Sequence, residues 1–438
     1  MNDVNEFVAY TNSILNGLDH DIDLGNRQNY FKFLWKQNRL LAFPHSVYSS
    51  YHKAILMLEK KANITKRSVS GSHVEATLND FLYNIYYCKK NNMKSLHLHG
   101  KVQELFRTIR RFKALEYIVI IPVLNMKIEQ PITIGNVEFV NLTPEKILEL
   151  RTGRNIDTMQ MTRVDERKLV KDFQGDSRHP TAAITIVVSS DSTKAEELAI
   201  QIVDQALNVL RFYIHAFRGI IKGEELKEVS RTVLISNITD KQEFVPSQEL
   251  CNMIDRDNPD ETIDNETLQL LKNKEINKLD RLLIMPIDGL SPLQRDVLDA
   301  LFWIGNAEKD VNPTDKLVKY VAALDTLLSQ DRRDKSETVA KRYTAIMNQH
   351  STKSEVVEAY CKIKNYYTFR NNVLHAGLRY ADPSILKDVL QDVRNILFEL
   401  LLYADSHKTV LELLETIFPI REKIYEDIER CNLCVNVF

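Results

Sequence analysis

The residues best suited to chemistry lie near the C-terminus, in the stretch 369–377, which reads Phe-Arg-Asn-Asn-Val-Leu-His-Ala-Gly. This stretch places a guanidinium, an amide and an imidazole within two turns of an expected amphipathic helix. An imidazole titrates near neutral pH and can accept or donate a proton, and a guanidinium is a permanently charged fork for phosphate oxygens. Attack of an RNA 2′-hydroxyl on the adjacent phosphate uses these groups and requires no metal. The stretch therefore points either to RNA cleavage or to an ordinary capped helix end with polar packing.

Helical spacing predicts how these side chains are arranged. Asn371 and His375 lie one turn apart on one face, and Tyr367 extends that stripe one turn earlier. Arg370 lies about 100° to the side of Asn371, and its long side chain can bend round to the same place. Gly377 is suited to the left-handed residue that ends a helix. We therefore expect Arg370 to clamp phosphate, Asn371 to orient a partner and His375 to act as general acid or base.

A single helix end supplies one histidine, whereas acid and base roles are easier to fill with two. A two-fold dimer would bring two copies of the motif to one cleft. The bare spacing is weak evidence, because an arginine five residues before a histidine is expected by chance about 0.6 times in this chain. The helical context therefore carries the hypothesis.

Length and composition bound the architecture. At 438 residues the chain exceeds one ordinary domain, and its 12 glycines and 12 prolines favour a helix-rich protein with few loops. The formal net charge of −2 does not by itself indicate nucleic acid. RNA contacts would need a local basic surface such as residues 89–113, for which a solvated helix face is the alternative interpretation.

The compartment and the cofactors are also addressed by the sequence. No signal peptide and no apolar stretch of membrane-spanning length are visible. Five cysteines, an odd number, indicate reduced thiols in a cytosol. We therefore expect a cytoplasmic protein that does not enter the membrane and needs neither a cofactor nor a metal.

The chain divides into three segments with different periodicity, which together predict a predominantly helical α+β protein. Residues 1–112 are predicted to be mostly helical, residues 113–285 to form a mixed α/β domain and residues 286–438 to form a helical bundle. In the middle segment, strands are expected at Glu116–Ile121, where Pro122 would stop the strand, at Ile132–Val140 as two pieces about a Gly-Asn turn, at 182–188 and at 232–235.

Helix boundaries are predicted from caps and apolar stripes. Thr193 and Glu196 form a capping-box pattern ahead of an apolar stripe that reaches Leu210. In the last segment, helices are expected at about 293–309, 315–329, 336–348, 354–376, 382–404 and 406–430. Their short connections predict antiparallel neighbours.

Arg370, Asn371 and His375 match, position by position, the signature of the HEPN superfamily: arginine, a polar residue, three variable residues and histidine. The order of helices over residues 293–405, about a quarter of the chain, resembles the Apea-like branch of that superfamily. There an upstream helix carries a segment similar to Tyr320–Leu328, in which Asp325 stands where that branch carries glutamate.

This resemblance implies a C-terminal HEPN-type bundle that dimerises and forms a composite, metal-independent RNA endonuclease site. Many members of the superfamily are toxins or abortive-infection effectors against phage, so RNA, a second copy of the chain, a phage trigger and an antitoxin are the partners it implies. Other members have lost the motif and only bind. A non-catalytic RNA-binding, oligomerisation or regulatory module is therefore the alternative function.

Further residues are weighed beside the motif. Arg379 would add a phosphate contact if the helix continued past Gly377, and Tyr367 or Tyr366 could stack on a base, although core packing is expected for at least one of them. The pair Cys431 and Cys434 has the spacing of a zinc or redox site but lacks obvious partners. No phosphate loop, dinucleotide-binding glycine motif, zinc-protease motif or serine-hydrolase motif is present.

Overall fold

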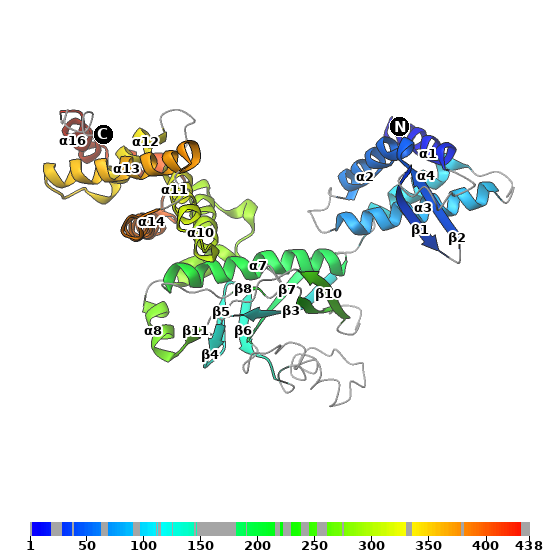
Figure 1. Cartoon of the computed structure of the whole chain (residues 1–438), viewed down its shortest axis with the longest axis horizontal. Helices are drawn as coiled ribbons and strands as arrows, with labels where there is room; N and C mark the ends of the chain where they lie inside the picture. The colour runs from blue at the N-terminus through cyan, green and yellow to red at the C-terminus, as the bar shows by residue number, and fades with distance from the viewer. Residues whose placement is uncertain are drawn as a thin grey trace.

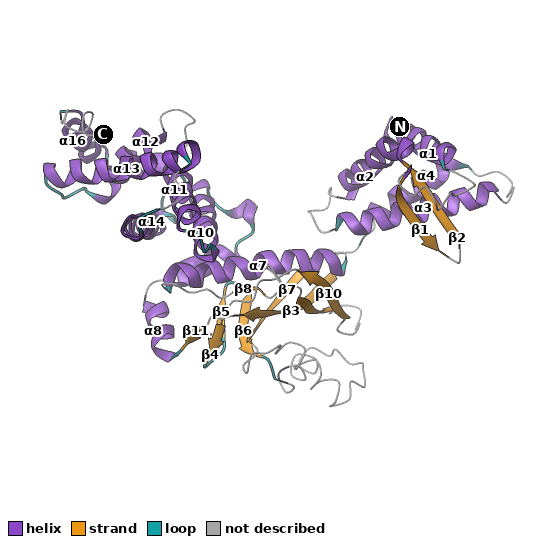
Figure 2. Cartoon of the chain, viewed as in Figure 1, coloured by secondary structure: helices purple, strands orange, loops and turns teal. Residues whose placement is uncertain are grey.

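The protein is mostly helical and carries a small antiparallel sheet, which confirms the α+β class with helix predominating (Figure 2). Its fold is described from a computed structural model. The description covers residues 2–18, 29–36, 39–62, 69–90, 97–110, 112, 115–124, 126–143, 146, 181–189, 191–214, 220–221, 229–237, 245–251, 261–273, 276–329, 335–377 and 381–430. In this part of the chain, no helix combines the length and the apolar character that a membrane span requires.

The N-terminal segment forms a unit with its own hydrophobic core, built from residues between Phe7 and Ile109 (Figure 1). Four helices pack with a hairpin that was not predicted from the sequence, because hydrophobic residues run through both strands without regular alternation. The elements are α1 (Asn2–Gly17), β1 (Tyr30–Lys36), β2 (Arg39–Pro44), α2 (Tyr48–Ala62), α3 (Gly71–Lys90) and α4 (Leu98–Arg110).

A seven-stranded antiparallel sheet forms the middle of the chain, with strand order β10-β9-β3-β7-β6-β5 and β8 beside β3. The long helix α7 (Ser192–Tyr213) lies along one face of this sheet (Figure 1). The strands are β3 (Leu115–Leu124), β5 (Ile132–Ile134), β6 (Val137–Asn141), β7 (Thr181–Ser189), β8 (Ile220–Ile221), β9 (Val229–Asn237) and β10 (Val245–Cys251); β4 (Met126–Ile128) and β11 (Glu261–Ile263) pair separately, in parallel.

The predicted turn between β5 and β6 is present, and Gly135 adopts a φ of 57° there. Two other expectations for this region are wrong. Strand β3 runs through Pro122. On one edge of β3 the pairing with β9 ends at Ile120 and the pairing with β8 begins at Val123, so no strand on this edge needs an N–H from Pro122. Helix α7 is capped by Asp191 rather than by Thr193, since the Asp191 carboxylate accepts the backbone N–H of Lys194 at 2.9 Å.

Asp191 also joins the N-terminal unit to the rest of the chain. Its carboxylate accepts hydrogen bonds from the backbone N–H of Ser70 at 3.0 Å and from the Ser70 hydroxyl at 2.8 Å. One buried carboxylate therefore both begins α7 and holds the residue that precedes α3.

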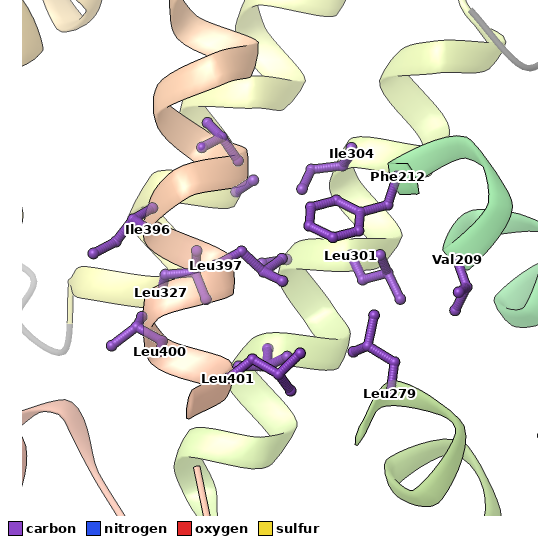
Figure 3. Packing of buried hydrophobic residues seen from close by; sticks show 14 of the residues in the cluster. Val209, Phe212, Leu279, Leu301, Ile304, Leu327, Ile396, Leu397, Leu400 and Leu401 are labelled. Carbon is purple, nitrogen blue, oxygen red and sulfur yellow. The ribbon is translucent and has the colours of Figure 1, made fainter. Parts of the chain in front are cut away.

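The side of α7 that faces away from the sheet packs against the C-terminal helices (Figure 3). Val209 and Phe212 of α7 face Leu301 and Ile304 of α10. Leu397 of α14 lies on the opposite side of Leu301 from Val209. The last turns of α7 are buried on all sides, and the two polar residues among them, Asn208 and Arg211, hydrogen-bond to each other. One core consequently runs from the sheet into the bundle and is shared by the predicted segments 113–285 and 286–438.

The C-terminal helices begin and end within about two residues of their predicted limits, except the last. The single helix expected at 406–430 is two helices, because Pro419 lies in the first turn of the second and cannot continue the first. The elements are α8 (Asn265–Asn273), α9 (Ile276–Ile284), α10 (Pro292–Lys309), α11 (Pro313–Leu328), α12 (Lys335–Met347), α13 (Lys353–Ala376), α14 (Pro383–Tyr403), α15 (Val410–Thr416) and α16 (Phe418–Glu429).

One cysteine departs from the expected reduced state. Cys361 in α13 is disulfide-bonded, so the expectation of reduced thiols is wrong for this residue, whereas Cys88 in α3 is a free thiol.

Gly305 allows α10 to approach α7 closely, and we expect Gly305→Ala to destabilise the fold by about 2 kcal/mol. A Cβ atom on Gly305 would lie 1.8 Å from Oδ1 of the fully buried Asn208, which itself accepts a hydrogen bond from Arg211. Urea unfolding would measure the loss. The cost should shrink in an Asn208→Ala background, and Gly100→Ala, in an open position on α4, should not destabilise. Equal costs in both backgrounds would contradict this packing.

Asp296 in α10 is expected to make stability depend on pH. Burial, with a smaller contribution from the neighbouring Asp299 carboxylate, raises the pKa of Asp296 to about 6. Because this value exceeds that of an unfolded aspartate, the folded state binds the extra proton, and stability falls as pH rises from about 4 to about 6. Because Asp296 is half-buried, Asp296→Asn should therefore raise the free energy of unfolding of the protein by about 1 kcal/mol at pH 7 and by almost nothing at pH 4.

Urea unfolding at the two pH values measures this difference. The exposed Asp288, exchanged for asparagine, is the matched control and should show no such dependence. A gain from Asp296→Asn that is the same at pH 4 and pH 7 would rule out the titration of Asp296 as its cause.

Candidate active site at the end of helix α13

Helix α13 carries the motif and ends where the sequence predicts. Thr352 and Glu355 form a capping box at its start. Gly377 follows the last helical residue with a φ of 69°, and its N–H donates to the carbonyl oxygen of Asn372. Arg370, Asn371 and His375 therefore occupy the final two turns of a 24-residue helix whose two ends are both fixed.

The end of α13 is less covered by the bundle than the rest of the helix, although Phe369 and Val373 still pack against the core. Ile363 and Tyr367 are buried, and the same helical stripe continues through Arg370 to Leu374. Leu374 is nevertheless 48% exposed, and Arg370 is only half-buried. The bundle therefore covers this stripe up to Tyr367 and leaves its last turn open.

The three motif side chains are accessible. Asn371 and His375 are exposed, one helical turn apart. Arg370 lies about 140° around the helix from His375, as five residues of an α-helix require. Its guanidinium bends toward Asn371, and Nη1 donates to Asn371 Oδ1 at 3.3 Å. The sequence prediction that the arginine reaches the amide is confirmed.

Tyr367 and Asp325 lie behind the motif and join two helices. The Tyr367 hydroxyl donates to Oδ1 of Asp325 in α11 at 2.5 Å, and its ring is only 4% exposed. Burial, together with the Asp325 carboxylate, raises the pKa of Tyr367 well above its usual range. A buried ring cannot stack on a base, so Tyr367 and Tyr366, which is 3% exposed, do not have the base-stacking role considered from the sequence. The geometry suits them to positioning α13.

Asp392 of α14 is a second anchor for α13. Its buried carboxylate accepts the hydroxyl of Tyr366 at 2.6 Å and that of Tyr343, in α12, at 3.1 Å, and Lys362 lies 2.8 Å away. Burial and this carboxylate raise the pKa values of both tyrosines. Asp392 was not predicted from the sequence, although an acid between Val389, Val393 and Ile396 on an apolar helix face is a signal of such an anchor.

The electrostatics single out Arg370 among the cations of α13. Lys353, Lys362 and Lys364 each lie within 3.7 Å of a carboxylate, from Asp427, Asp392 and Glu337 respectively. Arg370 has no ion pair within the described residues. From residue 359 to residue 381 the chain contains no aspartate or glutamate. The helix end therefore offers one guanidinium, one imidazole and several amides to an external anion, without an acid on the same segment to repel it.

Three other residues weighed from the sequence have no described position. Arg379, Cys431 and Cys434 lie outside the described residues. Within the described ranges, no group of three or more histidine, cysteine, aspartate or glutamate side chains could hold a metal ion.

Comparison with known proteins does not identify a family. No family model matches the chain, and searches of curated proteins and of solved structures give no significant match. A functional assignment therefore depends on the motif and on the geometry at the end of α13.

Proposed function

We propose that the protein is a metal-independent RNA endonuclease of the HEPN type, with its active site at the end of α13. The observation that carries this proposal is the accessible Arg370–Asn371 pair, one turn from the exposed His375 on a segment without acidic residues. In this assignment His375 transfers the proton, Arg370 clamps the phosphate, and Asn371 orients the guanidinium through the bond it already accepts.

The reaction follows from these groups. A base removes the proton of the RNA 2′-hydroxyl, whose oxygen attacks the adjacent phosphorus. The bond to the 5′-oxygen breaks as an acid protonates that oxygen, leaving a 2′,3′-cyclic phosphate and a 5′-hydroxyl. The guanidinium stabilises the charge that develops on the two non-bridging oxygens. One imidazole can serve as base or as acid, so two imidazoles on opposite sides of the phosphate complete the chemistry.

A two-fold dimer supports this chemistry better than a monomer. Within one chain, Arg370 and His375 project about 140° apart, so a second copy facing the first can present the complementary group to the same phosphate. Leu374 lies between them in sequence, on the stripe that the bundle leaves open. We infer that a second copy of the chain covers Leu374 and completes the site.

The biological setting follows from the same proposal. A nuclease that cleaves RNA without a cofactor is harmful to its own cytoplasm unless it is restrained. A toxin or anti-phage effector is therefore the proposed class, with a phage trigger or an antitoxin as the means of restraint. The alternative, an RNA-binding or oligomerisation module without activity, is decided by the assay below.

The direct test is cleavage of labelled RNA by the purified full-length protein in excess EDTA. The expected product ends are a cyclic phosphate and a 5′-hydroxyl, and His375→Ala should lack them. A growth assay accompanies the test, because a restrained effector shows no activity as a purified protein. Expression of the wild type should slow cell growth, and expression of His375→Ala should not. Equal toxicity of the two, with no RNA cleavage by either, favours the non-catalytic alternative.

Leu374→Glu is expected to separate the dimer and to lower cleavage at least tenfold. A buried carboxylate at a two-fold contact faces its symmetry mate and is costly to desolvate. Light scattering after size exclusion measures the mass, and the RNA assay measures the activity. Leu56→Glu, at a leucine that is 50% exposed on α2, is the matched control and should change neither. A Leu374→Glu protein with unchanged mass and activity would exclude Leu374 from the contact.

A further inference from the structure

The charge of the chain is unevenly distributed. Residues 1–112 contain sixteen lysines and arginines and nine acidic residues, a formal charge of +7, whereas the remaining residues carry −9. The overall value of −2 conceals this difference. Among the described residues of the N-terminal unit, eleven lysines and arginines and six acidic residues give +5, and because the unit has its own core this charge attracts anions to one folded body.

A pocket of about 640 Å³ opens on this basic unit, between the last turns of α1 and α3. Leu15 and Asn16 of α1 line it together with Tyr86, Lys89 and Lys90 of α3. Its volume falls within the range of small-molecule sites. It combines two ammonium groups and an exposed amide with the small parts of Leu15 and Tyr86 that reach the surface, a mixture of polar and apolar groups that suits a small anionic ligand.

The two lysines of this pocket are available to a ligand. Other lysines of the unit are neutralised: Lys32 pairs with Glu75, Lys36 with Asp80, Lys61 with Asp3 and Lys101 with Glu104. Lys89 and Lys90 are exposed and form no ion pair within the described residues. Their place in the last turn of α3 is favourable for a cation in any helix, but it does not explain the open volume beside them.

We infer that this pocket binds a nucleotide, with its phosphate at Lys89 and Lys90, its base at the exposed Asn16 amide, and only the edges of Leu15 and Tyr86 in contact with it. Adjacent ammonium groups match the charge of a phosphate, and the asparagine amide can both donate to and accept from a base edge. The nucleotide is either free or part of a single RNA strand. The inference does not depend on the nuclease assignment, since the pocket lies in a different folded unit from α13.

The test measures binding with full-length His375→Ala protein, so that no RNA is lost to cleavage. The probes are a fluorescent single-stranded RNA decamer, followed by anisotropy, and unlabelled mononucleotides as competitors. The double variant Lys89→Gln/Lys90→Gln should weaken binding at least tenfold, since each lost contact to a charged phosphate is worth about a factor of 10. The slope of log affinity against log salt should also fall by about 0.7, the value for one phosphate contact on a single strand.

The matched control is Lys53→Gln/Lys60→Gln, which removes the same charge from two exposed lysines of α2 that form no ion pair within the described residues. It should weaken binding less than threefold. Asn16→Asp, which keeps both lysines and places a negative charge in the pocket, should also weaken binding at least tenfold. Competition by mononucleotides identifies a free nucleotide as the ligand, and decamer binding without such competition identifies an RNA strand.

Two results would overturn the inference. One is an equal loss of affinity in the two double-lysine variants, which would mean that only the overall charge of the unit matters. The other is the absence of binding by both the decamer and the mononucleotides to protein with an intact pocket. Neither result would bear on cleavage at α13, which the EDTA assay tests separately.

Discussion

His375→Ala is expected to lower the rate of RNA cleavage by about a thousandfold while the protein stays folded. Proton transfer by a positioned side chain contributes roughly 10²–10⁴-fold to such reactions. Because His375 is exposed in the last turn of α13, its removal should change the free energy of unfolding by less than about 0.5 kcal/mol. Single-turnover cleavage of a labelled RNA measures the rate, and urea unfolding confirms the intact fold.

Asn372→Ala is the matched control for His375→Ala. Asn372 is exposed on the same two turns but is not part of the motif, so its loss should alter cleavage less than threefold. Arg370→Lys tests whether the shape of the guanidinium matters in addition to its charge. This variant keeps the positive charge but loses the forked geometry, and it should lose most of the cleavage activity. If His375→Ala cleaves RNA as fast as the wild type, the proton is carried by another group and the site assignment is wrong.

Asp392→Ala is expected to destabilise the protein by about 3 kcal/mol, the largest stability effect of any single change considered. The substitution leaves the hydroxyls of Tyr343 and Tyr366 without their acceptor and the Lys362 ammonium without its partner, at a site that is 8% exposed. Leaving a buried hydroxyl without its acceptor costs roughly 1–3 kcal/mol, and this substitution leaves two, whereas the Lys362 ammonium is partly exposed to water. Chemical unfolding in urea measures the loss.

Tyr366→Phe provides the comparison for Asp392→Ala. It removes one hydrogen bond and keeps the ring, so it should cost about 1 kcal/mol. The two substitutions should not be additive, because they break the same contact. If Asp392→Ala costs no more than Tyr366→Phe, the carboxylate is not the junction of α12, α13 and α14 that its contacts indicate.

These two predictions separate chemistry from architecture. His375→Ala should lower the cleavage rate and leave the free energy of unfolding unchanged. Asp392→Ala should lower the free energy of unfolding and affect cleavage only by reducing the fraction of folded protein. An Asp392→Ala protein that still folds at low temperature should cleave RNA at close to the wild-type rate per folded molecule.

Local signals in the sequence determined much of the architecture. The helix α13 and its end at Gly377 follow from an apolar period of 3.6 and from a residue that tolerates positive φ, both of which act within a few residues. The Gly135 turn between β5 and β6 follows for the same reason. The bend of Arg370 toward Asn371 was also predictable, because it joins neighbouring residues on one helix.

Contacts between distant segments were decided only by the tertiary structure. The sequence could not show that Tyr367 meets Asp325 across 42 positions, that Asp392 gathers three helices, or that Asp191 rather than Thr193 begins α7. Nor could it show which cations of α13 are already neutralised and that Arg370 is not among them. Periodicity reports which face of an element is buried but not what covers it, since that depends on how far-separated helices pack.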